Sequence, residues 1–212
     1  ICRTEVAMDK DMAKKISLFC NVRPEAVIEE KDVDFSIYEV PMMLIESGLD
    51  QRILKHLELK PTKKLVTDDW QQLLKVVKHP QHEITIAVTG KYIELHDAYK
   101  SIYESLSHAG IANHCKVNLR KVSAEQVAEE GADKLLAGVD GILVPGGFGE
   151  RGFEGKIASI AYARKQKIPF LGICYGMQAA VVEYARSELG LADATTTEYD
   201  PDANNPVISL ME

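Results

Sequence analysis

The stretch that decides the fold reads Phe170-Leu171-Gly172-Ile173-Cys174-Tyr175-Gly176-Met177-Gln178-Ala179. An apolar run enters it and a helical pattern leaves it, which predicts a buried strand that turns sharply into a helix. Glycines on both sides of Cys174 give the small-x-nucleophile-x-small spacing of a nucleophile elbow. At the helix N-terminus, the dipole and the N–H groups favour a thiolate. We therefore predict that Cys174 is a nucleophile and that the Tyr175 N–H faces a developing oxyanion.

A glycine-rich loop precedes this stretch by one helix. It reads Val144-Pro145-Gly146-Gly147-Phe148-Gly149-Glu150-Arg151-Gly152. Consecutive N–H groups in such a loop form an anion-binding nest, which beside a nucleophile supplies the other half of an oxyanion hole. A phosphate cradle and a flexible turn are the alternatives. The Lys-Ser/Thr pair of a phosphate-binding P-loop does not follow the glycines, which favours the oxyanion hole.

Strands and helices alternate on both sides of these motifs. We predict strands over 84–88, 115–122, 141–144 and 170–173, and helices over 97–109, 124–136, 154–167 and 175–187. Gly110 is expected to close the first of these helices, and Ser123 to cap the second through a capping box with Gln126. Alternation of this kind predicts an α/β fold, a mostly parallel sheet with helices on both faces.

The first part of the chain is less regular and predicts a smaller α/β piece over residues 1–60. We expect a helix over 9–19, a short buried strand over 26–28, and a helix over 40–57 that is interrupted near Gly48. Residues 61–82 are expected to form a linker, with a short helix over 70–78 and Thr67 as its N-cap. Residues 83–212 then form the second domain.

Composition excludes several classes of function. The chain has 212 residues and a formal net charge of −7, which disfavours a general nucleic-acid binder. No apolar run approaches the roughly 20 residues needed to cross a bilayer. The four cysteines Cys2, Cys20, Cys115 and Cys174 form no CxxC pair, so a reduced, cytoplasmic setting is expected and Cys174 alone is assigned chemistry.

The two motifs resemble those of class I (triad) glutamine amidotransferases, and more narrowly of the CTP synthase family. That family carries the same Pro-Gly-Gly-Phe-Gly-x-Arg-Gly loop over 145–152 and a similar Gly-Ile-Cys-x-Gly-Met-Gln elbow over 172–178. Residues 90–101 and 31–38 also match it. The resemblance spans nearly the whole chain. It implies the end of a synthetase (amidoligase) domain followed by a glutaminase domain that stops before its His-x-Glu element.

The resemblance implies roles for residues in the second domain. Cys174 would be the acyl-enzyme nucleophile, and Gly147 would donate to the oxyanion with Phe148 beside it. The glutamine site would be lined by Tyr175, Gly176, Met177 and Gln178. Glu198 would hold the substrate amino group, although a solvated loop carboxylate is the alternative reading.

The resemblance also implies nucleotide sites in the first domain. Arg3, Lys31, Asp32 and Val33 would contact ATP, and Lys15 would face UTP or the feedback inhibitor CTP. Arg3 and Lys15 could equally be surface charges, and 31–34 a polar turn. The family further implies Mg²⁺ with ligands outside this chain, GTP as an activator, a homotetramer, and a cytoplasmic ligase of pyrimidine biosynthesis without nucleic-acid or membrane partners.

The chain departs from the family pattern in two places. No histidine follows His114, so we expect the triad His and Glu beyond residue 212 and this chain alone to be nearly inactive. Tyr175 stands where leucine is common, which should leave the backbone N–H intact. The alternatives are another triad amidotransferase, such as a GMP synthetase or carbamoyl phosphate synthetase component, a cysteine peptidase or deglycase, and a non-enzymatic filament component.

Overall fold

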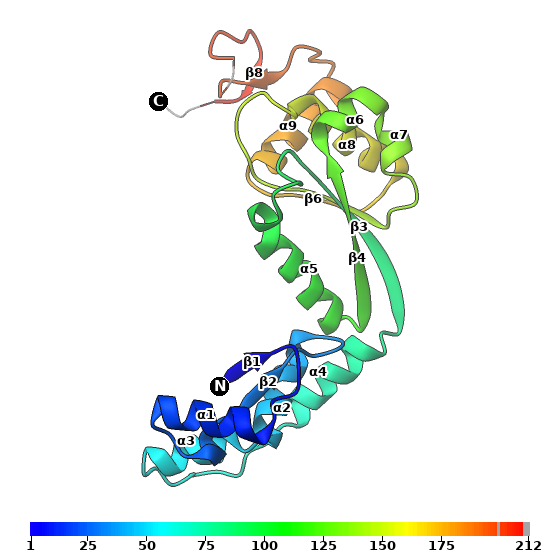
Figure 1. Ribbon diagram of the computed structural model, residues 1–212. Coiled ribbons are helices and arrows are strands. Elements are labelled where there is room, and N and C mark those ends of the chain that lie inside the picture. Colours follow the sequence, from blue (N-terminus) through cyan, green and yellow to red (C-terminus); the bar gives the residue numbers. More distant parts are fainter. Residues whose placement is uncertain (199, 210–212) are drawn as a thin grey trace. The chain divides into compact units, whose positions relative to one another are not determined.

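The computed structural model describes residues 1–198 and 200–209, apart from the side chain of His96. The chain divides into two compact units, Ile1–His79 and Pro80–Glu212. Figure 1 shows the elements of both units, each of which is described by itself below.

The second unit is built on a parallel sheet of four strands. These are β3 (His82–Gly90), β4 (Cys115–Ser123), β5 (Gly141–Val144) and β6 (Phe170–Gly172), in the spatial order β4-β3-β5-β6. All four predicted strands are confirmed, with ends that move by at most two residues. The chain runs from β3 to β4 on one side and then crosses back to β5 and β6 on the other side. The topological switch point of the sheet therefore lies between β3 and β5.

Helices cover both faces of this sheet, as predicted (Figure 1). Ala87 and Ile142 pack on one face against α6 (Ala124–Glu130), α8 (Phe153–Gln166) and α9 (Tyr175–Glu188). Val88 and Leu143 point to the other face and pack against Tyr103 of α5 (Lys100–Ala112). Side chains of neighbouring strand residues alternate between faces, which is why one apolar strand supplies two separate cores.

Two helix boundaries differ from the sequence prediction. The helix predicted over 97–109 begins as the 3₁₀ turn η3 (His96–Tyr99), and α5 then continues through Gly110 to Ala112. A Cβ at Gly110 would lie 2.7 Å from the Cys115 carbonyl oxygen, so this glycine permits close helix–strand packing instead of ending the helix.

The second difference lies after Ser123. The predicted helix over 124–136 is divided into α6 and α7 (Ala132–Leu135) at Gly131, whose φ of 93° lies outside the helical region. Ser123 does cap α6, because its side chain accepts a hydrogen bond from the Gln126 N–H. The chain beyond α9 forms a small parallel pair, β7 (Thr195–Thr196) and β8 (Pro206–Ile208).

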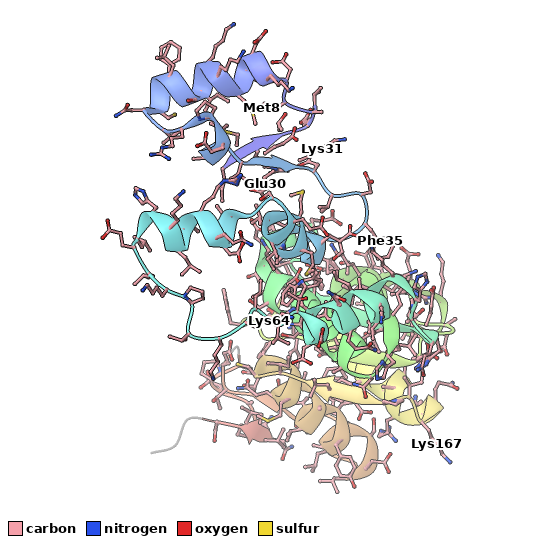
Figure 2. All side chains as sticks on the ribbon, turned by 90° about the horizontal axis from the view of Figure 1, so that it is seen from below. Met8, Glu30, Lys31, Phe35, Lys64 and Lys167 are labelled. Carbon is pink, nitrogen blue, oxygen red and sulfur yellow. The ribbon has the colours of Figure 1, made fainter. Side chains whose placement is uncertain are left out.

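The first unit has its own pair of parallel strands, β1 (Cys2–Thr4) and β2 (Glu29–Lys31). The remaining elements are α1 (Lys10–Cys20), η1 (Pro24–Ala26), η2 (Ile37–Glu39), α2 (Val40–Glu46), α3 (Leu49–His56) and α4 (Asp68–Lys78). Figure 2 shows Lys31 at the point where β2 runs on toward Phe35. The two helices α2 and α3 are separated at Gly48, as predicted, by a residue with φ 74°.

The prediction of a strand over residues 26–28 is wrong. Pro24 and Ala26 lie in the 3₁₀ turn η1, and pairing begins only at Glu29. Proline at the first position of a helical turn fixes φ in the helical range, which outweighs the short apolar run after it.

The helix predicted over 70–78 is confirmed as α4, and Thr67 occupies its N-cap position. The Thr67 hydroxyl accepts from the Gln71 side chain instead of from a backbone N–H. Within the first unit, Trp70 Nε1 donates to the Tyr38 carbonyl at 2.8 Å. Among the described residues, no helix combines the length and apolar character that a bilayer crossing requires.

Candidate functional site

Cys174 lies at the turn between β6 and α9, where the sequence predicted a nucleophile elbow. Its φ of 51° and ψ of −109° are rare for a residue with a side chain, and it is the N-cap residue of α9. The residue is exposed although its neighbours Tyr175 and Gly176 are buried. A strained backbone held by well-packed surroundings is typical of functional residues.

The glycines on either side of Cys174 are required by the close approach of backbone to backbone. A Cβ at Gly172 would lie 2.6 Å from the Gly176 carbonyl oxygen, and a Cβ at Gly176 would lie 2.0 Å from the Val144 carbonyl oxygen. The same Val144 oxygen accepts a hydrogen bond from the Ile173 N–H at 3.0 Å. The elbow is therefore held directly against the end of β5.

The glycine loop over 145–152 starts at that end of β5 and passes beside Cys174. A Cβ at Gly146 would lie 3.6 Å from the Cys174 Cβ, in ordinary contact. A Cβ at Gly147 would lie 3.7 Å from Cδ1 of Tyr175. The structure thus places the predicted oxyanion loop against the predicted nucleophile.

Several side chains fix the loop. The Tyr175 hydroxyl donates to the Gly149 carbonyl at 2.7 Å, and the Gly149 N–H donates to Oε1 of Glu198 at 2.9 Å. Lys91 donates to the Phe148 carbonyl, and its Nζ lies 4.5 Å from the centroid of the Phe148 ring. An ion pair of 2.6 Å joins Arg151 to Glu125 of α6.

The predicted glutamine-site residues differ in exposure. Phe148 and Met177 are 65% and 55% exposed, so both offer apolar surface to a ligand. Gln178 is half-buried, and among the described residues its Oε1 has no hydrogen-bond partner. The Glu198 carboxylate is exposed but anchored to the loop through Gly149.

Lys156 was not among the residues predicted from the sequence. It is fully buried in the first turns of α8. Its Nζ lies 4.7 Å from the centroid of the Tyr175 ring. Burial, and next the charge of Lys91, lower the pKa of Lys156 to about 8, while Cys174, Glu198 and Glu125 oppose the shift. The sequence does indicate this burial, because Lys156 is spaced three residues from Phe153 and four from Ile160 and so lies on the same buried face of α8.

The predicted ATP residues lie together in the first unit. Both Nε and an Nη of Arg3 donate to Oδ1 of Asp32, at 3.1 and 2.9 Å. Lys31, Asp32 and Val33 line a cleft of about 630 Å³ together with residues of α2 and α4. Lys15 is exposed on α1 and is not part of the lining of this cleft.

No metal site is formed by the described side chains. Among these side chains, no three or more His, Cys, Asp or Glu residues gather in a group that could hold a metal ion.

Two protein families match the chain. The model of the class-I glutamine amidotransferases matches residues 94–208, and the model of the CTP synthase N-terminus matches residues 1–59. The chain is 50% identical over 211 residues to CTP synthase of Caldanaerobacter subterraneus subsp. tengcongensis, covering 100% of this chain and 39% of the relative. It is 51% identical over 211 residues to CTP synthase of Nitratidesulfovibrio vulgaris, covering 100% of this chain and 38% of the relative.

A solved structure shows the same similarity. The glutaminase domain of Trypanosoma brucei CTPS with bound acivicin matches with a TM-score of 0.57 and 38% identity, over 61% of this chain and 50% of that chain. The chain spans about two fifths of the length of the curated relatives it matches, 39% in the first case. With both family models and the whole-chain identity in agreement, the chain belongs to the class-I glutamine amidotransferases and, within them, to the CTP synthase family.

Proposed function

We propose that this chain is part of a glutamine-dependent CTP synthase, in which Cys174 is the nucleophile that releases ammonia from glutamine. The observation that carries the proposal is the exposed Cys174 at a strained turn, φ 51°, directly beside Gly146 of the glycine loop. A thiol at a helix N-terminus, next to a loop of backbone donors, has the parts that acyl transfer requires.

In the first stage, the Cys174 thiolate attacks the carboxamide carbon of glutamine. Negative charge develops on the carbonyl oxygen, and the backbone N–H groups of Gly147 and Tyr175 stabilise it. Glu198 attracts the substrate ammonium group, while Phe148 and Met177 cover its aliphatic part. The carbon–nitrogen bond then breaks, and ammonia leaves a glutamyl thioester on Cys174.

In the second stage, water hydrolyses the thioester to glutamate and regenerates Cys174. The proton transfers need a base, which we assign to the His-x-Glu element of the family and to none of the described residues. Ammonia then reaches the synthetase part. There a phosphoryl group from ATP has activated the uracil carbonyl oxygen of UTP, and ammonia displaces phosphate to give CTP.

The nucleotide part of the proposal rests on the first unit. The cleft beside Lys31, Asp32 and Val33 is where we propose that ATP binds, with Arg3 held at its ion pair to Asp32. Lys15 is proposed to contact UTP or CTP as a fixed cation for phosphate. Mg²⁺ would neutralise phosphate charge during transfer. CTP inhibition, GTP activation, a homotetramer and a cytoplasmic location complete the proposal by analogy with the family.

The test compares two nitrogen donors in the full-length protein with Cys174→Ala. We expect CTP formation from UTP and ATP to be lost with glutamine and kept with ammonia, since the substitution removes only the nucleophile. Wild-type activity with both donors would refute the role of Cys174. If the unmutated protein hydrolyses glutamine but makes no CTP, the amidotransferase stands and the CTP assignment is wrong.

A further inference from the structure

Lys156 is a buried charge that the proposed mechanism does not use. The residue is the fourth of α8, and its relative exposure is 0%. Lysine is almost never fully buried unless it is paired, because an ammonium group loses its hydration on burial. Among the described residues, however, its Nζ has no hydrogen-bond partner.

The amine of Lys156 lies close to Gly147 of the glycine loop and to Tyr175, the residue after the nucleophile. Its Nζ is 3.1 Å from the position that a Cβ on Gly147 would occupy, and 4.7 Å from the centroid of the Tyr175 ring. Gly147 and Tyr175 are the two residues proposed to donate to the oxyanion. A single cation thus lies close to both halves of the site.

The charges around Lys156 come from four other segments. Lys91, after β3, carries a charge of the same sign and destabilises the ammonium form. The groups that stabilise it are Cys174 at the elbow, Glu198 after β7 and Glu125 in α6. Of these three groups, Cys174 stabilises the ammonium form most, and Glu125 is in addition paired with Arg151.

We propose that Lys156 is a positioning residue whose buried positive charge stabilises the Cys174 thiolate and the oxyanion that forms beside Gly147. The second half of this statement rests on the proposed function. Lys156 itself takes up no proton from the thiol: the Cys174 thiol releases its proton to solvent or to a base, and at pH 7 the ammonium of Lys156 keeps its own proton. Cation and thiolate favour one another by Coulomb attraction, which is strong where water is excluded.

The test is the rate of Cys174 alkylation by iodoacetamide as a function of pH, in wild type and in Lys156→Met. The thiolate attacks the CH₂ carbon and iodide leaves, so the rate reports the thiolate fraction. Methionine has a similar length without charge, and Lys165→Met is the matched control because Lys165 is an exposed lysine on the same helix. Mass spectrometry of the Cys174 peptide gives the rate, with the exposed Cys20 in the same sample as an internal reference.

We expect Lys156→Met to move the midpoint of the alkylation profile upward by about one pH unit, which slows alkylation about tenfold at pH 7. Lys165→Met and the Cys20 peptide should stay at wild-type values. An unchanged midpoint in a folded Lys156→Met protein would overturn the proposal. Lys156→Gln, which is also uncharged, gives the same test if the methionine variant does not fold.

The alkylation needs neither glutamine nor a nucleotide, so the two proposals can fail separately. If Cys174→Ala leaves glutamine-dependent activity intact while Lys156→Met still shifts the profile, the proposed function is wrong and the electrostatic role stands. If Cys174→Ala behaves as proposed but the profile does not move, Lys156 is structural only.

Discussion

The backbone N–H of Gly149 donates a 2.9 Å hydrogen bond to Oε1 of Glu198. This bond connects the glycine loop to the segment after β7, two pieces that are 49 residues apart in sequence. One carboxylate therefore has two roles in the proposed site: it fixes the loop and presents negative charge to a substrate ammonium group.

Replacing Glu198 with glutamine separates these two roles. Glu198→Gln keeps an acceptor for the Gly149 N–H but removes the charge, so we expect the KM for glutamine to rise about tenfold or more. CTP formation with ammonia as donor should not change. The matched control is Glu150→Gln, an exposed carboxylate in the same loop. A normal KM for glutamine in Glu198→Gln would mean that the carboxylate is only a structural anchor.

Tyr175→Phe removes one hydroxyl that fixes the loop. The Tyr175 hydroxyl donates to the Gly149 carbonyl at 2.7 Å while its ring packs on Phe153. We expect a loss of about 1 kcal/mol in the free energy of unfolding, since the ring stays and one hydrogen bond is lost. Glutaminase kcat should fall more than KM rises, because the loop carries a proposed oxyanion donor. Tyr184→Phe, on an exposed part of α9, should leave stability and kinetics unchanged.

Two glycines near the nucleophile should differ strongly in how much stability the protein loses when each is replaced by alanine. In Gly176→Ala, the new Cβ would lie only 2.0 Å from the Val144 carbonyl oxygen. We therefore expect the free energy of unfolding to fall by about 3 kcal/mol, or the variant not to fold. In Gly146→Ala, the nearest atom is the Cys174 Cβ at 3.6 Å, and stability should change by less than about 1 kcal/mol. Urea denaturation measures both. Equal stabilities would show that the elbow can move away from β5.

Lys156 should give the protein a distinctive dependence of stability on pH. Its folded pKa of about 8 lies below the ordinary value of 10.5, so between these two values the unfolded chain binds more protons than the folded protein. Stability therefore rises as pH rises through this window, by up to about 3 kcal/mol for a shift of this size. Below about pH 8 the ammonium is present in both states and its burial penalty is constant.

The measurement is the urea midpoint of wild type and Lys156→Met between pH 7 and pH 10. Lys156→Met should be the more stable protein at pH 7, and the difference should shrink toward pH 10 as the wild type loses its buried charge. Lys165→Met should follow the wild-type curve throughout. A constant difference between wild type and Lys156→Met would show that packing, and not charge, separates them.

Much of the second unit could be predicted from the sequence because local patterns and tertiary contacts agree there. The apolar run before Cys174 forms β6. The glycines on either side of Cys174 are needed because neighbouring backbone atoms lie too close to leave room for a Cβ. The helix boundary at Gly110 could not be predicted locally. Its role depends on Cys115 and Val117 of β4, which reach the glycine only after the helix has packed.

In the candidate site, the nucleophile could be predicted from the sequence, but the side chains packed around it were harder to predict. A lysine in a helix usually faces solvent, and the burial of Lys156 depends on how α9 and the glycine loop close over α8. Arg3 and Asp32 are 29 residues apart, and their ion pair follows from the parallel register of β1 and β2, which the sequence does not specify. The role of Glu198 is a prediction that Glu198→Gln tests, and the roles of Arg3 and Lys15 stay predictions.

The Val144 carbonyl oxygen links the two halves of the site mechanically. It accepts from Ile173 at 3.0 Å and faces Gly176, while the next residue along the chain begins the glycine loop. The nucleophile and the oxyanion loop are thus both attached to one peptide group at the carboxyl end of β5, an inner strand of the sheet. When the outer helices fluctuate, both parts should shift in step, so the spacing that acyl transfer requires would survive motions that displace the site as a whole.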